Sequence, residues 1–163
     1  MRKLLLLSPG GNFNDVLTGN TGNNVLNGGA GTDTMSGLAG NDTLNGGAGN
    51  DTLTGEAGAD RFLFNSTLGS TNVDSVTDFV TTQDQFQLDD AVFTAIGAVG
   101  AFAVGDARFH SGAAAALITD RIIYDSSTGA LYYDADGTGA TAAVQFATLT
   151  DHATLAASDI VVV

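Results

Sequence analysis

The stretch GGAGTDTMSGLAGNDTLNGGAGNDTLT, residues 28–54, repeats one nine-residue pattern three times without a gap. The same frame continues on both sides, because GGNFNDVLT and GNTGNNVLN precede this stretch and GEAGADRFL follows it. Six units therefore run from residue 10 to residue 63. A short, gapless period of this kind is typical of a solenoid, in which every unit forms the same small piece of structure.

Three columns of the repeat have a clear physical role. Glycine stands at the first position and usually at the second and fourth, as at Gly28, Gly29, Gly31, Gly37, Gly40, Gly46, Gly47, Gly49, Gly55 and Gly58. Glycine lets the backbone curl tightly enough to point several carbonyls at one spot. The sixth column holds Asp15, Asn24, Asp33, Asp42, Asp51 and Asp60, and the eighth holds Leu17, Leu26, Met35, Leu44, Leu53 and Phe62. Each unit is thus expected to be a glycine turn followed by a short strand with its eighth-position side chain inside.

One such strand cannot bury a core alone, so two units should close one coil of eighteen residues and the coils should stack. Stacking produces parallel sheets on both faces. The sequence therefore predicts an all-β fold class, with a parallel β-roll over residues 10–63. Along one edge of this roll we expect Asp15, Asp33 and Asp51, and along the other Asn24, Asp42 and Asp60.

These stacked acidic residues predict a cation site. Carboxylates in adjacent coils, roughly 4.8 Å apart, repel by about 1 to 3 kcal/mol, depending on the effective dielectric. A cation between the turns converts this repulsion into attraction. A ligand set of carboxylate and backbone carbonyl oxygens suits Ca²⁺. Zn²⁺ would require His or Cys, and the repeats contain neither. We expect about four inter-turn calcium ions and leave a higher number open; the four pairs are Asp15 with Asp33, Asp33 with Asp51, Asn24 with Asp42, and Asp42 with Asp60.

The first coil departs from the pattern in two places. Phe13 replaces glycine at the fourth position of the first unit, and Asn24 replaces aspartate in the second. Both changes weaken the expected site, so calcium binding in this coil stays an open question.

The units resemble the RTX (repeats-in-toxin) nonapeptide G-G-x-G-x-D-x-U-x, where U is apolar, which is a calcium-binding repeat of β-rolls. The resemblance covers residues 10–63, and a flexible glycine-rich linker would not need a periodic apolar column. It implies that the region folds when calcium fills its turns.

Residues 64–163 change character, because turn residues separate longer apolar runs. We expect strands at 62–64, 85–88, 122–124, 131–133, 144–149 and 160–163, with turns at 126–129 and 135–139. The Ala-rich stretches 91–103 and 113–117 fit short helices or loops equally well. Asp74 and Asp78 fit either an extra calcium site at the junction or ordinary loop positions. The DADG of residues 134–137 is expected to be a hairpin turn, since it lacks the later ligands of an EF-hand.

This second half resembles the C-terminal region that follows RTX repeats in serralysin-type proteases and other type I secreted bacterial proteins. The resemblance rests on ADRFLF (59–64), NVDSVTDF (72–79), DRIIYDSSTGALYYDADGTG (120–139) and SDIVVV (158–163). It implies an antiparallel, β-sandwich-like cap on the roll. It also implies an uncleaved export signal at residues 159–163, read by the type I secretion machinery, so that the protein is extracellular. A last core strand is the alternative for these residues, and both can hold.

Charge and composition restrict the partners. The chain has 18 acidic residues against five Lys and Arg, a formal net charge of −13. Nucleic acids are poor partners for such a surface, because their binding relies on clustered basic residues. No apolar run is long enough for stable membrane insertion. There is no Cys, and the leucines after Arg2 and Lys3 are too few for a signal peptide, so residues 1–9 are interpreted as a leader or a segment added by cloning.

Catalysis is not expected. His110 and His152 are the two histidines, and neither an H-E-x-x-H nor a G-x-S-x-G motif is present. The predicted function is a calcium-driven folding and secretion module, either a small protein or the tail of a longer chain with an upstream catalytic domain. The alternatives are a carbohydrate-binding module, because alginate epimerases carry similar RTX units, or an adhesive or ice-binding roll. The few basic residues disfavour an anionic polysaccharide, and the third column (Asn12, Thr21, Ala30, Ala39, Ala48, Ala57) lacks a regular row of Thr.

Overall fold

The computed structural model describes residues 5–6 and 11–163. Most of the expected leader, residues 1–9, lies outside the described residues, as does residue 10, where the repeats begin. Within the leader, Leu5–Leu6 forms β1, which pairs in parallel with β3 (Asn24–Ala30).

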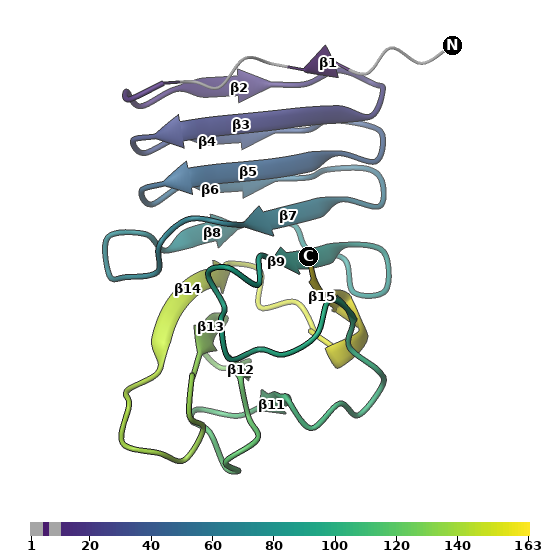
Figure 1. The fold of residues 1–163 in the computed structure, drawn as a ribbon. Coiled ribbons are helices and arrows are strands. Elements are labelled where there is room, and N and C mark those ends of the chain that lie inside the picture. Colours follow the sequence, from purple (N-terminus) through teal and green to yellow (C-terminus); the bar gives the residue numbers. More distant parts are fainter. Residues whose placement is uncertain (1–4, 7–10) are drawn as a thin grey trace.

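The repeats form a parallel β-roll, as predicted (Figure 1). One sheet contains β2 (Val16–Thr18), β4 (Thr34–Ser36) and β6 (Thr52–Thr54), and the other contains β3, β5 (Thr43–Ala48) and β7 (Arg61–Phe64). Every neighbouring pair is parallel, and its partners lie eighteen residues apart, as in Leu17↔Met35↔Leu53 and Leu26↔Leu44↔Phe62. The nine-residue period is therefore half of one coil.

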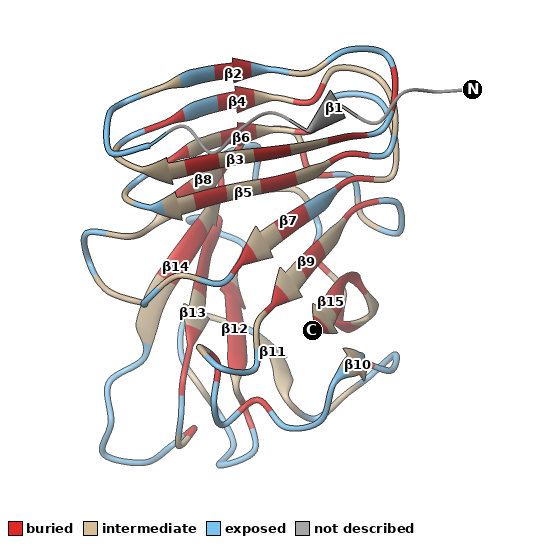
Figure 2. Cartoon of the chain, turned by 45° about the horizontal axis from the view of Figure 1, so that its top comes forward, coloured by how far each residue is buried: buried red, intermediate tan, exposed pale blue. Residues whose placement is uncertain are grey.

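The eighth-position side chains form the core between the two sheets. Leu26, Met35, Leu44, Leu53 and Phe62 are 0% exposed, and Leu17 in the outermost coil is 8% exposed. Figure 2 shows the resulting alternation, in which a buried residue lies at the middle of each three-residue strand. Each fully buried side chain of this size contributes roughly 1.5 to 3 kcal/mol, which explains why one apolar residue per strand suffices once the coils stack.

A fourth coil continues both sheets beyond the repeats. It contributes β8 (Asp74–Val76), which pairs in parallel with β6, and β9 (Gln85–Leu88), which pairs in parallel with β7. Phe86 of β9 packs against Phe62, with ring centroids 6.1 Å apart, so the core of the roll continues without a break.

The remaining chain forms the cap. Its elements are β10 (Gly100–Ala101), β11 (Phe109–Ser111), β12 (Ile122–Asp125), β13 (Ala130–Tyr133), β14 (Val144–Leu149), a 3-10 helix at Ala157–Asp159, and β15 (Ile160–Val162). The expected antiparallel meander is present as β12–β13–β14. No helix forms in the described Ala-rich stretches 91–103 and 113–117.

The cap differs from the expectation in one respect, because it is not a purely antiparallel sandwich. β14 pairs in parallel with β8, and β15 pairs in parallel with β9, so the two sheets of the roll run on into the cap. The physical reason is that the last coil presents free N–H and C=O groups on both sheet edges, and these need partners. No helix in the described part of the chain is long and apolar enough to cross a membrane.

Candidate metal centre

The sixth-position residues form two ladders, one along each edge of the roll. The backbone N–H of Asp15 donates to Oδ1 of Asp33 at 2.7 Å, and the N–H of Asp33 donates to Oδ1 of Asp51 at 2.7 Å. On the other edge, the N–H groups of Asn24 and Asp42 donate to Oδ1 of Asp42 and Asp60, at 2.6 and 2.8 Å. The structure thus brings the six predicted residues together as the sequence spacing implied.

The second oxygen of each ladder carboxylate is buried without a partner. Oδ2 of Asp15, Asp33, Asp42, Asp51 and Asp60 accepts no hydrogen bond. Asp33 and Asp42 are 0% exposed, and Asp51 and Asp60 are 1% exposed. A buried, unpaired polar atom costs about 1 to 3 kcal/mol, and more when it is charged. These rows of oxygens therefore need a positive partner.

The first glycine of each repeat makes room for that partner. A Cβ on Gly28 would collide with Oδ2 of Asp33 and would lie 2.6 Å from the carbonyl oxygen of Gly46 in the next coil. A Cβ on Gly37 would likewise collide with Oδ2 of Asp42, 2.9 Å from the carbonyl oxygen of Gly55. Carboxylate and carbonyl oxygens thus converge on a cradle that any side chain would fill.

The other repeat glycines allow adjacent turns to approach closely. Gly47 and Gly49 have φ of 97° and 136°, and a Cβ on either would collide with the backbone of the preceding coil. Left-handed backbone is far easier for glycine than for other residues. The same contact with the preceding coil occurs at Gly29, Gly31, Gly40 and Gly58.

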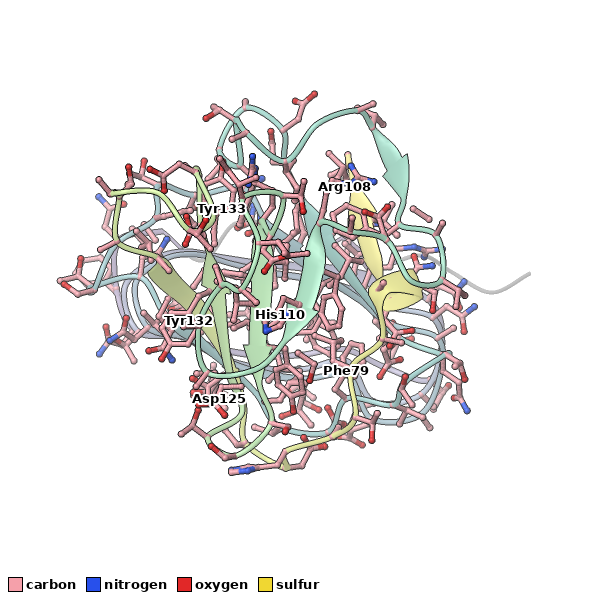
Figure 3. All side chains as sticks on the ribbon, turned by 90° about the horizontal axis from the view of Figure 1, so that it is seen from below. Phe79, Arg108, His110, Asp125, Tyr132 and Tyr133 are labelled. Atoms are coloured by element: carbon pink, nitrogen blue, oxygen red, sulfur yellow. The ribbon has the colours of Figure 1, made fainter. Side chains whose placement is uncertain are left out.

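The ladder carboxylates carry negative charge that no basic side chain neutralises in the described part of the chain. Burial raises the pKa of Asp51, and burial together with repulsion from Asp84, Asp42 and Asp78 raises the pKa of Asp60 to about 6. Within the described residues, no ladder carboxylate forms an ion pair. Arg108, labelled in Figure 3, belongs to the cap. Its Nη2 lies 2.8 Å from Oδ2 of Asp106, and its guanidinium lies over the Phe102 ring, so it pairs with no ladder carboxylate.

The donor set fits a hard cation bound largely by carbonyls. No three His, Cys, Asp or Glu side chains converge in the described part of the chain, so any ion depends on backbone oxygens. Six to eight oxygens in a flexible geometry suit Ca²⁺, whereas Mg²⁺ requires a strict octahedron and retains water. The absence of nitrogen and sulfur ligands in the repeats disfavours Zn²⁺.

The first coil has a different arrangement at Asn24. Its amide Nδ2 donates to Oδ1 of Asp42 at 2.9 Å, to the carbonyl of Asn20 at 3.2 Å and to the carbonyl of Gly22. N–H groups therefore occupy oxygens that a cation would otherwise bind. This arrangement supports the weaker calcium site expected for this coil, which stays a prediction.

Replacing Asn24 with Asp should therefore create a stronger cation site. The Asn24→Asp variant exchanges two N–H donors for a second anionic oxygen beside Asp42. We expect calcium affinity in this coil to rise about tenfold, which corresponds to 1.4 kcal/mol. Calorimetric titration of the variant and wild type measures this, with Asn23→Asp, at an exposed neighbouring position, as the control for charge alone. Equal affinity in all three proteins would contradict it.

Both ladders extend past the last repeat, which the sequence reasoning missed in part. The N–H of Asp51 donates to Oδ1 of Asp74 at 3.1 Å, and the N–H of Asp60 donates to Oδ1 of Asp84 at 2.9 Å. Asp74 was considered for the junction, but Asp84 was not considered at all. The steps of 23 and 24 residues break the period. The available signal was the D-x-apolar ending shared by Asp60-Arg61-Phe62, Asp74-Ser75-Val76 and Asp84-Gln85-Phe86.

Comparisons with known proteins agree with this geometry. A family model of the RTX calcium-binding nonapeptide repeat matches residues 9–44 and 36–66, with four copies. No curated protein matches the chain. The solution structure of the AlgE6R3 subunit of the Azotobacter vinelandii mannuronan C5-epimerase is similar, with 29% identity, a TM-score of 0.56, and coverage of 92% of this chain and 78% of that one. The AlgE6R2 subunit of the same enzyme has 24% identity, a TM-score of 0.55, and coverage of 97% and 91%, and supports the fold alone.

Proposed function

Since residues 9–66 are RTX repeats, which bind calcium, we propose that this chain is a calcium-folded module of a secreted bacterial protein, without catalysis of its own. The observation that carries the proposal is the double row of buried carboxylates whose Oδ2 atoms have no partner. Ions between the turns satisfy these oxygens and cancel the repulsion along each edge. Folding free energy then comes from calcium binding to the native state alone.

The proposed ligands are those of the repeat. Each ion lies between two turns of the same edge and takes side-chain oxygens from the sixth-position residues of both, which are carboxylates in every pair except Asn24 with Asp42. Backbone carbonyls of the turn glycines complete the set, as the convergence of Asp33 Oδ2 and the Gly46 carbonyl supports. About four ions fit within the repeats, consistent with the four matched copies.

The Asp42→Ala variant tests this ligand assignment. Asp42 lies in the middle of its ladder, between Asn24 and Asp60, and so serves two sites. We expect it to lose both, with a fall in overall calcium affinity of at least about tenfold. Calorimetry measures the number of ions and their affinity. Asp90→Ala removes an exposed carboxylate off the ladders and should match wild type. If Asp42→Ala also matches wild type, the ladder assignment is wrong.

We further propose that the type I secretion machinery exports the chain by reading residues 159–163. The resemblance of SDIVVV (158–163) to the C-terminal segments of such proteins supports this route. In this proposal residues 10–63 serve as the calcium-dependent unit, and residues 64–163 close the roll and carry the signal. A catalytic domain upstream in a longer chain is compatible with the same arrangement. Nothing in the site geometry favours the carbohydrate-binding alternative over this function.

A further inference from the structure

The two carboxylates at the end of the repeats are as buried and as unsatisfied as those inside. Asp51 and Asp60 are each 1% exposed, and Oδ2 of each has no hydrogen-bond partner. Each Oδ2 lies where a Cβ on the first glycine of its repeat, Gly46 or Gly55, would collide with it. The carboxylate side of the cradle seen at Gly28 and Gly37 is therefore repeated at the last turn of each edge, but there the atoms nearest to the Cβ position include no carbonyl oxygen of a following coil.

The next carboxylate on each edge comes from outside the repeats. Oδ1 of Asp74 and Oδ1 of Asp84 accept the N–H groups of Asp51 and Asp60, in the same way that each ladder residue accepts from the one before. Asp74 and Asp84 are 4% and 3% exposed. The fourth coil thus supplies a carboxylate rung although its sequence contains no G-G-x-G-x-D unit.

Side-chain oxygens of the fourth coil also take the place of turn carbonyls. On the first edge, the N–H of Gly31 donates to the carbonyl of Ala48 at 2.9 Å, and one coil later the N–H of Gly49 donates to Oδ1 of Asn72 at 2.9 Å. A non-repeat segment therefore reproduces the oxygen positions of a repeat turn.

The second edge shows the same replacement with a carboxylate. The N–H of Gly37 donates to the carbonyl of Thr54 at 2.9 Å, whereas the N–H of Gly55 donates to Oδ1 of Asp78 at 3.0 Å. The second oxygen of Asp78 accepts from the N–H of Glu56 at 2.6 Å. An extra negative charge therefore lies beside the rung formed by Asp60 and Asp84.

Carboxylates crowd the last rung of each edge without a basic partner. Asp74 lies against Asp51, and Asp84 lies against Asp60 with Asp78 and Asp159 nearby, so their negative charges repel one another. Neither group forms an ion pair within the described residues. A divalent cation would relieve this repulsion and satisfy the two orphan oxygens at the same time.

We propose that the fourth coil binds two further calcium ions. One lies between the turns of Asp51 and Asp74, with Asn72 as an additional oxygen ligand, and one lies between those of Asp60 and Asp84, where the nearby charge of Asp78 strengthens binding. This inference rests on the proposed function, but it places metal sites where the nonapeptide pattern has ended. The second ion also joins the roll to the C-terminal segment. Oδ2 of Asp84 accepts the N–H of Val80, and the adjoining Thr81 and Thr82 bind Asp159, just before β15.

Counting the bound ions by native mass spectrometry of the full chain tests this proposal. Wild type should retain about six calcium ions, two more than the four expected within the repeats. Asp74→Asn and Asp84→Asn keep the shape and the Oδ1 acceptor but remove the charge, so each should retain one ion fewer. Asp90→Asn, an exposed position off the ladders, should retain the wild-type number. Unchanged ion numbers in both rung variants would overturn the proposal.

A further variant tests the proposal in case Asp74→Asn or Asp84→Asn fails to fold. Asp78 is only partly buried, so Asp78→Asn should fold, keep the ion number and weaken one site by about tenfold in a calcium titration. An unchanged affinity profile would also count against the proposal. Circular dichroism on the same samples shows whether each variant folds. The ion counts then distinguish failure of the proposed function from failure of this inference. If wild type binds no calcium, the proposed function fails; if Asp42→Ala loses ions while the rung variants do not, this inference alone fails.

Discussion

Removing calcium is expected to unfold the repeat region, residues 11–63, almost completely. Each pair of stacked carboxylates repels by about 1 to 3 kcal/mol without a cation, and the buried Oδ2 atoms add a desolvation cost. Native domains are stable by only about 5 to 15 kcal/mol in total. Three such pairs lie within the repeats, Asp15 with Asp33, Asp33 with Asp51, and Asp42 with Asp60, and together with the desolvation cost they are enough to cancel most of the stability that the apolar ladder provides.

Circular dichroism during a calcium titration measures this transition. A chelated sample should give the spectrum of a largely disordered repeat region, and calcium should restore the β signal cooperatively. Magnesium at the same concentration is the matched control and should be far less effective, since its octahedral preference does not suit a set of carbonyls and carboxylates. A chelated sample with the full β signature would refute calcium-driven folding.

The roll could be predicted from sequence because the nine-residue pattern specifies both the length of a coil and the stacking of its carboxylates. The spacing of Leu26, Leu44 and Phe62 sets the coil length, and the same eighteen-residue step brings Asp42 above Asp60. Glycine at the first position predicted a crowded turn, although the pattern alone did not reveal that this glycine faces an orphan Oδ2. Atomic positions were needed to recognise that one oxygen is bonded while the other is not.

The fourth coil and the cap could be predicted only in part, because their pairing depends on contacts far apart in the chain. Strands such as β12 and β14 were predicted from local apolar runs, and the structure confirms them. The parallel pairing of β14 with β8 and of β15 with β9 was not predicted, because it leaves no short-range trace in the sequence. An inserted loop of a few residues was enough to hide the continuation of the ladders to Asp84.

Deleting residues 159–163 is expected to block export through a type I system, with at least a tenfold loss of secreted protein relative to wild type. In the folded chain most of this segment is inaccessible, because Asp159 is 2% exposed, Ile160 and Val162 are 0% exposed, and β15 lies between β9 and β10. A signal here must be read before folding. Weak extracellular-class calcium sites, with Kd of about 10⁻⁴ to 10⁻³ M, stay empty in the cytosol and keep the chain unfolded until it has left the cell.

The structure also shows that this deletion removes a strand paired on both sides, with β9 and β10, so export must be separated from stability. Leu88→Ala is the matched control, because Leu88 is 0% exposed on β9 and pairs with Val162 of β15. Its loss should destabilise the cap by about 2 to 5 kcal/mol while residues 159–163 stay intact. We expect this variant to be exported at near wild-type levels and the deletion variant to remain in the cell, with calcium-induced β signal retained by the repeats in both. Equal export of the deletion variant and wild type would reduce residues 159–163 to a core strand. Equal loss in both variants would assign the defect to stability instead of a signal.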